Sequence, residues 1–169
     1  MAQEIRELRE ARECRRDDPQ RSLEIYNEYI DAHPDDAQAY FSRHLTWDQL
    51  GDREQALADC SRSADLDPHW ITFLMRGRLF RELGDHERAV ADFDRSHALD
   101  PEQWRTGFGP HFRADSLARL GRLEEALKDC ALIREDHRMP AHSGLPGGNK
   151  QQFTAEIRRR ARIARGKQA

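Results

Sequence analysis

Residue types that usually carry out chemistry are sparse in this chain of 169 residues. The three cysteines, Cys14, Cys60 and Cys130, are far apart and form no Cys-x-x-Cys pair. Eight histidines are present, but none lies in a His-x-x-x-His or Cys/His pattern at metal-ligand spacing. The sequence therefore predicts no metal and no cofactor, and the odd number of cysteines favours a reducing compartment.

Motifs of catalysis and of membrane insertion are missing as well. The sequence has no glycine-rich phosphate loop, nucleophile elbow or paired-carboxylate motif, so we predict that the protein is not an enzyme. No apolar run approaches the roughly 20 residues that a membrane helix needs. The first residues also lack the layout of an export signal. We therefore expect a cytoplasmic protein without a membrane anchor.

Lysine is scarce, and charge is distributed unevenly. The formal net charge of −3 is close to neutral, so it gives no general attraction to nucleic acid. Residues 150–169 nevertheless hold seven Lys and Arg residues and one Glu. Four of them form a candidate basic patch: Arg158, Arg159, Arg162 and Arg165. The simpler interpretation, which we favour, is the solvated outer face of a terminal helix.

Three stretches of the chain, residues 50–60, 83–93 and 120–130, are near-copies of one another. Their glycines are 33 and then 37 residues apart. A repeat at this period is typical of a stacked array of small helical units. The charged fraction of 35% and the aromatic fraction of 8% also suit a thin helical array, in which each helix has a large solvated face.

Each copy predicts two helices joined by a tight turn. Gly51 suits the left-handed position just past a helix, and Asp52 suits the cap of the next helix. Small and apolar residues then recur at steps of three and four, as on one face of a helix. Pro68 prevents that second helix from continuing. The sequence therefore predicts an all-α protein.

These residues resemble the tetratricopeptide repeat family. Its units carry an aromatic residue near position 4, small residues near 8 and 20, an aromatic near 24 and a proline near 32. The best match in this chain supplies Phe73, Gly77, Ala89, Phe93 and Pro101 at those positions. In the preceding unit His44 replaces the small residue at position 8, and we expect this change to loosen the packing.

The resemblance implies a right-handed superhelical solenoid of helix-turn-helix units with a C-terminal capping helix. The expected segments are a degenerate first unit (1–36), two units (37–69 and 70–103), a unit with an irregular start (104–140), a Pro/Gly linker (141–150) and a basic capping helix with its tail (151–169). Whether the chain has three units or four depends on the degenerate segment and is left open.

Family analogy also places the binding surface along the first helices of the units. The groove-facing positions give nine candidates: Phe41, Leu45, Asp48, Ile71, Leu74, Arg78, Arg81, His111 and Asp115. Apolar anchors beside charges of both signs suit an extended peptide or an amphipathic helix of another protein. Some family members instead hold a carboxylate in a clamp that needs lysine and asparagine. Neither residue occurs between Ala37 and Arg119, so that version is excluded.

Two other functions stay open beside a general protein-binding adaptor. A chain of this length and repeat number could be a dedicated small chaperone for one client protein. A nucleic-acid accessory that uses the arginine-rich helix is less favoured, because only the one basic patch supports it. Weak association of two copies through their end helices is a further alternative that the sequence does not decide.

Overall fold

The computed structural model describes residues 2–136, 145 and 148–166. Every regular element in these ranges is a helix, from α1 to α10, and they contain no β-strand. None of the described helices is both long and apolar enough to cross a lipid bilayer. The chain forms two compact units, Met1–Thr72 and Phe73–Ala169. The all-α prediction is therefore confirmed.

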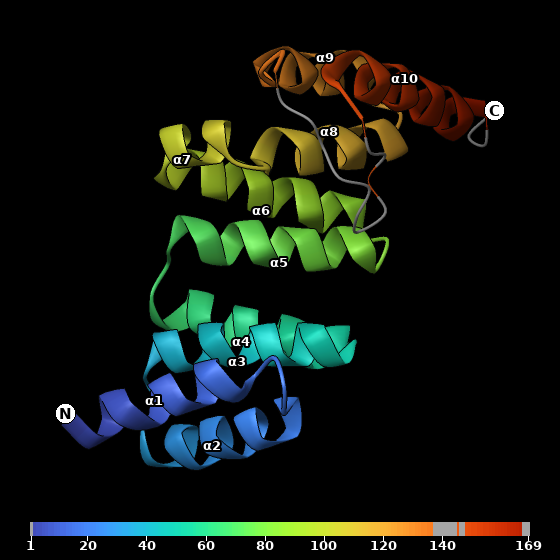
Figure 1. The fold of residues 1–169 in the computed structure, drawn as a ribbon. Coiled ribbons are helices and arrows are strands. Elements are labelled where there is room, and N and C mark those ends of the chain that lie inside the picture. The colour runs from blue at the N-terminus through green and yellow to red at the C-terminus, as the bar shows by residue number, and fades with distance from the viewer. Residues whose placement is uncertain (1, 137–144, 146–147, 167–169) are drawn as a thin grey trace. The chain divides into compact units, whose positions relative to one another are not determined.

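The N-terminal unit contains two helix pairs: α1 (Ala2–Cys14) with α2 (Pro19–Ala32), and α3 (Ala37–Leu50) with α4 (Arg53–Leu66). Helix α2 also packs against α3, so the pairs stack (Figure 1). Buried apolar residues hold the stack together: Ala11, Ile25, Tyr26, Tyr29, Ile30 and Ala39. The helix periodicity of these residues places them on facing sides, where they exclude water.

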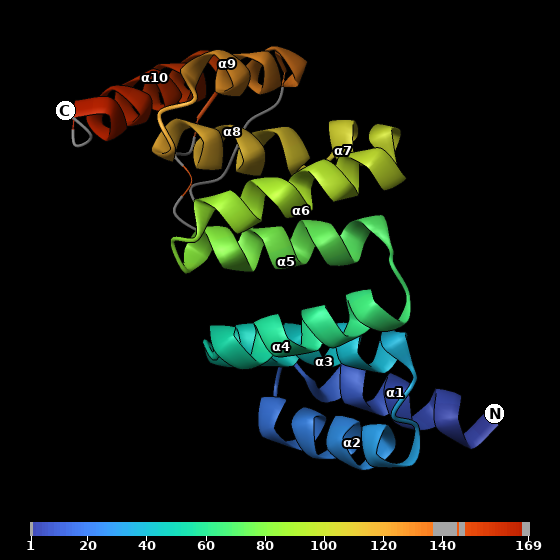
Figure 2. The ribbon, with the colours of Figure 1, turned by 180° about the vertical axis from the view of Figure 1, so that it is seen from behind.

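The C-terminal unit contains most of α5 (Trp70–Glu82), then α6 (His86–Leu99), α7 (Pro101–Thr106), α8 (Gly109–Arg119), α9 (Leu123–Leu132) and α10 (Lys150–Gly166). Helix α8 packs against α6 and α9, and α10 lies across α8 and α9 (Figure 2). The inner face of α10 buries Phe153, Ile157 and Ala161. The prediction of a C-terminal capping helix is confirmed. Of the predicted linker (141–150), residues 141–144 and 146–147 lie outside the described residues, and Lys150 already belongs to α10.

The repeated Gly-Asp and Gly-Arg steps form the turns within the helix pairs. Gly51, Gly84 and Gly121 have φ angles of 82°, 85° and 76°, a region that residues with a side chain rarely adopt. After the first two turns, Asp52 and Asp85 accept a hydrogen bond from a backbone N–H in the next helix. The turn chemistry that the sequence predicts is therefore present in the structure.

Pro101 has a second role that the repeat pattern does not predict. The repeat pattern predicts only that a unit ends at Pro101, but the short helix α7 also begins at this residue. Asp100 accepts a hydrogen bond from the backbone N–H of Gln103, and Pro101 occupies the first turn, where its missing N–H costs no hydrogen bond. One Asp-Pro pair thus ends α6 and starts α7. Trp104 of α7 is almost fully buried.

Within a helix pair, a large side chain on one helix is matched by a small residue at the facing position of the other. In the third unit Gly77 leaves room for Phe93, whose ring would lie only 2.7 Å from a Cβ atom at position 77. In the second unit the equivalent positions hold His44 and Cys60, so the large residue is on the first helix instead. His44 is fully buried and packs against Phe41, with ring centroids 4.7 Å apart. Its bulk is accommodated within the core.

An arginine–aspartate ion pair links the two helices at the same positions in three units. The pairs are Arg43 with Asp59, Arg76 with Asp92 and Arg113 with Asp129, with nitrogen–oxygen distances of 2.6, 2.7 and 3.0 Å. Both partners are largely buried, and each guanidinium contacts both carboxylate oxygens. Because removing one partner would leave a buried charge, these pairs fix how the two helices meet.

The ion pair of Arg113 with Asp129 is expected to make the folding stability of the C-terminal unit depend on pH. Burial raises the pKa of Asp129 to about 6, against an ordinary value of 3.8, although Arg113 opposes this shift. The folded protein therefore holds this proton more tightly than the unfolded chain does. Ionisation of Asp129 should cost folding stability as pH rises from about 4 to about 6, by up to ~3 kcal/mol.

We expect Asp129→Asn to flatten this part of the pH profile, even though loss of the ion pair lowers stability overall. Urea unfolding of the whole protein at a series of pH values would measure the slope. Glu87→Gln is the matched control, because Glu87 is an exposed carboxylate of the same unit. An unchanged slope in Asp129→Asn would contradict the prediction.

Candidate binding surfaces

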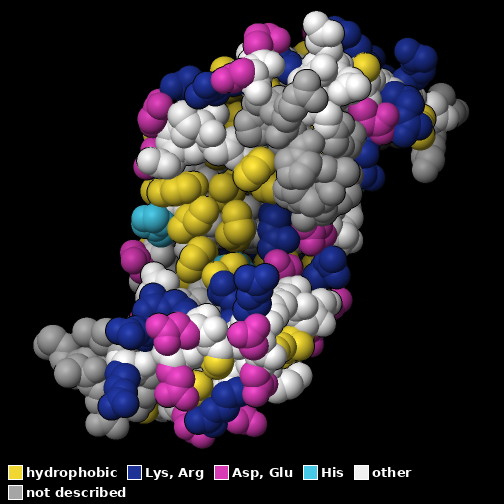
Figure 3. All heavy atoms as spheres, viewed as in Figure 1, with side chains coloured by type: hydrophobic (Ala, Val, Ile, Leu, Met, Phe, Trp, Pro, Cys, Tyr) yellow, Lys and Arg dark blue, Asp and Glu magenta, His cyan; other side chains and the backbone are white. Residues whose placement is uncertain are grey.

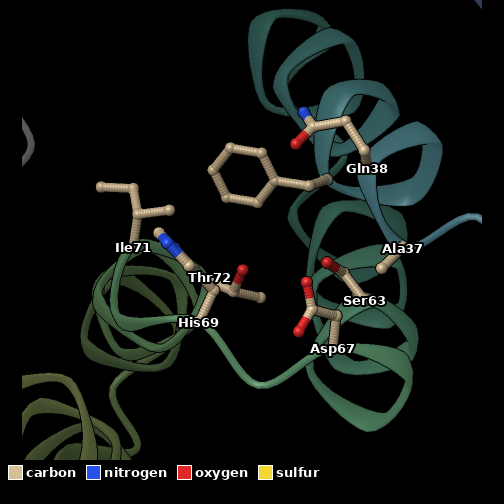
Figure 4. A pocket seen from close by; sticks show the side chains of 8 residues that line it. Ala37, Gln38, Ser63, Asp67, His69, Ile71 and Thr72 are labelled. Carbon is tan, nitrogen blue, oxygen red and sulfur yellow. The ribbon is translucent and has the colours of Figure 1, made fainter. Parts of the chain in front are cut away.

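The N-terminal unit contains a pocket of about 140 Å³ between the start of α3, the end of α4 and the segment that leads into α5. Gln38 and Ile71 lie on opposite sides of it, and Ser63 and Asp67 come from the end of α4 (Figure 4). Phe41 also lines the pocket. This volume is close to that of a cavity that can hold one benzene ring. The pocket can therefore take one apolar side chain.

Polar groups surround this pocket. Ser63, Asp67, His69 and Thr72 line it together with the apolar residues, and Asp67 and His69 are exposed. Gln38 donates a hydrogen bond to Ser42 through its side-chain nitrogen, which leaves the amide oxygen on the pocket side as an acceptor. An apolar centre with polar groups at its edge is the usual composition of a site that binds a peptide.

Four of the nine predicted groove residues lie in the N-terminal unit, and all four are half-buried. Phe41 and Ile71 meet at the pocket described above. Leu45 and Asp48 lie one and two turns further along α3 and do not line it. The structure thus brings two of the four predicted residues together, and their role in binding stays a prediction.

The other five predicted groove residues lie in the C-terminal unit, and most are buried. Hydrophobic side chains gather over α5, with Lys and Arg side chains beside them (Figure 3). Leu74, Arg81, His111 and Asp115 are each 5% exposed or less. Arg78 is half-buried and pairs with Glu82 at 2.9 Å. These side chains serve contacts within the unit, and a direct role in holding a partner stays a prediction.

Asp115 is the centre of a buried charge cluster. It is fully buried and accepts hydrogen bonds from Arg81 at 3.0 Å, from Arg119 at 3.2 Å and from Arg160 at 2.5 Å. Burial lowers the pKa of Arg81, and Asp115 opposes that shift. Because these arginines come from α5, α8 and α10, the cluster joins three helices through one carboxylate.

Helix α10 carries the predicted basic patch. Arg159 is 63% exposed and pairs with Glu156, and Arg165 donates a hydrogen bond to the backbone oxygen of Gly121. Arg158 and Arg162 are exposed on the same helix. Two of the four predicted residues are therefore engaged within the protein, and binding by this patch stays a prediction.

A second pocket, which we call the basic pocket, lies where α10 passes the end of α8 and the start of α6. It has a volume of about 380 Å³. Six residues line it: His86, Arg119, Arg159, Arg160, Ile163 and Ala164. The sequence predicts no role for His86 or Arg160. The available signal for Arg160 was its place three residues after the buried Ile157, which turns it towards the inner face of α10.

Cysteine and histidine chemistry has little support among the described residues. The three cysteines carry thiols rather than disulfides, and Cys60 and Cys130 are buried. Burial raises the pKa of Cys130 to about 11, which keeps this thiol protonated and unreactive near neutral pH. No group of three or more His, Cys, Asp and Glu side chains in the described part of the chain could hold a metal ion.

Comparison with solved structures identifies the same architecture elsewhere. A crystal structure of the MamA protein superposes with a TM-score of 0.71 at 12% identity, covering 98% of this chain and 85% of that chain. The MamA RS-1 ArsTM double mutant gives 0.69 at 14% identity, covering 98% and 96%. MamA AMB-1 in the C2221 form gives 0.59 at 23% identity, covering 67% and 65%. At these identities the likeness shows the fold alone.

Another MamA crystal structure, at 15% identity and a TM-score of 0.63, is matched over only 66% of its length. No curated protein matches the chain in sequence. The sequence profile of the family described as Tetratricopeptide repeat matches residues 12–69 and 48–103. Together these matches cover more than half of the chain. The protein belongs to the tetratricopeptide repeat family.

Proposed function

We propose that this protein is a non-catalytic scaffold that binds a segment of another protein along the first helices of its repeats. Proteins of this family generally act as interaction modules. The observation that carries the proposal is the pocket beside Phe41 and Ile71, which has room for one apolar side chain. Cysteines that carry thiols rather than disulfides fit a reducing compartment, and we propose that this function is exercised in the cytoplasm.

Binding would depend on one anchor and its polar surroundings. An apolar side chain of the partner enters between Phe41 and Ile71, where burial excludes water from both surfaces. Gln38, Ser63 and Asp67 then meet the polar groups of the partner's backbone at the edge of the pocket. This arrangement suits an extended peptide, because its side chains and its main chain are both accessible.

Peptides selected by display from a random library provide the test. We expect the selected peptides to share one apolar residue, and Ile71→Arg to weaken their binding about tenfold or more, because it places a charge beside the anchor. Leu50→Arg is the control, since Leu50 is exposed in the same unit and does not line the pocket. Equal losses in both variants, or no loss in either, would refute this pocket as the binding site.

Arg78 and Arg81 are poor probes of binding, although the sequence places them in the groove. Arg81 is buried against Asp115, and Arg78 pairs with Glu82, so changing either residue disturbs the interior of the C-terminal unit. A loss of binding in such variants would not separate recognition from folding. The half-buried Ile71 avoids this difficulty.

The dedicated chaperone is a narrower form of the same proposal. If no peptide binds but one intact client protein does, the chaperone is the correct form. The nucleic-acid accessory has less support, because the basic patch of α10 is the one feature that favours it, and Arg165 of that patch already donates a hydrogen bond to the backbone of Gly121. Weak self-association remains a separate proposal, which sedimentation of the purified protein at increasing concentration would test.

A further inference from the structure

The basic pocket contains more positive charge than its own carboxylates neutralise. The charged groups of the pocket and its supporting cluster come from α5, α8 and α10, and His86 is in α6. They comprise five arginines and three carboxylates: Arg78, Arg81, Arg119, Arg159, Arg160, Glu82, Asp115 and Glu156. Exposed Glu87 lies next to His86 in sequence. The cluster therefore keeps an excess of positive charge in a partly buried place.

Two groups at this pocket retain unused hydrogen-bonding capacity. Arg119 is 40% exposed and contacts Asp115 through its Nε atom, while its two Nη atoms donate to none of the described residues. The Nδ1 atom of His86 is buried and has no hydrogen-bond partner in the described part of the chain. A buried ring nitrogen without a partner is costly, so His86 adds an unsatisfied polar atom beside the pocket.

Hydrogen bonds orient two arginines of the pocket. Arg160 donates to both Asp115 and Glu156, which together set the position of its guanidinium. Glu156 also fixes Arg159 through two hydrogen bonds. Ile163 and Ala164 complete one side with an apolar surface. Donors fixed in advance bind an anion at a smaller entropic cost than mobile side chains do.

We propose that the basic pocket binds an oxyanion, a carboxylate or phosphate group attached to a small apolar body. The Nη atoms of Arg119 and the guanidinium groups of Arg159 and Arg160 donate to its oxygens, and Ile163 and Ala164 contact the apolar part. With the ligand bound, the positive form of His86 is favoured, because a negative charge then lies beside the ring. The inference is independent of the proposed peptide pocket in the other unit.

Nuclear magnetic resonance on the whole protein can test this site with defined probes. The pKa of free His86 is lowered, first by burial and then by Arg119. We expect inorganic phosphate or N-acetylglutamate to raise it and to shift the backbone signals of His86 and Arg119. The two probes separate a phosphate from a carboxylate source. Sodium chloride at equal ionic strength is the control for screening, which weakens the repulsion from Arg119; the rise in pKa with the effective probe should exceed the rise with sodium chloride.

Matched arginine variants separate the pocket from the general charge of α10. Arg119→Gln should weaken binding of the effective probe about tenfold, as expected for loss of a charged hydrogen bond. Arg158→Gln makes the same charge change one residue before Arg159, at an exposed position that does not line the pocket. Its affinity should equal that of the unchanged protein.

The inference is overturned if neither probe raises the pKa of His86 more than sodium chloride does, or if Arg158→Gln and Arg119→Gln weaken binding equally. A circular dichroism spectrum and unfolding curve of Arg119→Gln would show whether the fold is retained. If it is not, Arg159→Gln replaces it, since Arg159 is exposed and does not contact Asp115. The same tenfold loss is then required of that variant.

Discussion

Replacing Asp115 by alanine is expected to lower the free energy of unfolding of the C-terminal unit by about 3–5 kcal/mol. The carboxylate is fully buried and receives Arg81, Arg119 and Arg160. Without it, Arg81 would remain buried and would lose the carboxylate with which it pairs at 3.0 Å. The repulsion among Arg81, Arg119 and Arg160 would also no longer be offset by a negative charge. Urea unfolding followed by circular dichroism would measure the change.

Two further variants show whether charge is the cause. Asp115→Asn keeps the side-chain shape and one acceptor but removes the charge. The free energy of unfolding should therefore fall by less than it does in Asp115→Ala. Asp94→Ala removes a carboxylate that is 54% exposed and pairs with Arg113, and we expect a cost below about 1 kcal/mol. A loss in Asp115→Ala no larger than in Asp94→Ala would show that the cluster does not stabilise the fold.

Phe93→Ala is expected to cost about 3–5 kcal/mol as well, through a cavity rather than a charge. Phe93 is fully buried, packs against Phe112 with ring centroids 6.2 Å apart, and occupies the space that Gly77 leaves. Glycine has no side chain that could turn into the vacated volume. The loss should appear as a lower urea midpoint with little change in helix content at low urea.

Gly77, which faces Phe93, provides a test of this matching of small and large residues. Gly77→Ala alone should be destabilising by about 1–3 kcal/mol, because the new Cβ would lie 2.7 Å and 2.9 Å from two ring atoms of Phe93. Phe93→Cys with Gly77→Ala should lose less than the sum of the two single changes. Strict additivity of the two changes would contradict a direct steric contact.

Local chemistry accounts for the parts of the fold that the sequence predicts well. Glycine at positive φ and aspartate at the helix caps depend on residues next to one another in the chain, so Gly51 and Asp52 are sufficient to predict their turn. The buried stripe of α10 follows from its own periodicity. The sequence pattern does not predict helix α7, because Pro101 is typical of the end of a repeat and here also starts the next helix.

The candidate sites are harder to predict because they depend on residues far apart in sequence. Asp115 and Arg81 occupy groove-facing positions by analogy, but Arg160 of the capping helix meets Asp115 across 45 positions of sequence. The spacing of a repeat does not contain that information. The arginine–aspartate pairs are different, because Arg43, Arg76 and Arg113 recur with the repeat and could have been found by aligning the three units.

Each recurring arginine–aspartate ion pair lies within a single helix pair. An arginine on the first helix finds its aspartate 16 positions later on the second, so a unit that is duplicated or deleted takes both partners with it. Neither member of this pair would be left buried without the other by such an event. The Asp115 cluster has the opposite property, because its carboxylate needs Arg160 from outside the repeat. Repeats with only the internal pair can therefore be gained or lost during evolution, whereas the last unit is tied to the helix that closes the array.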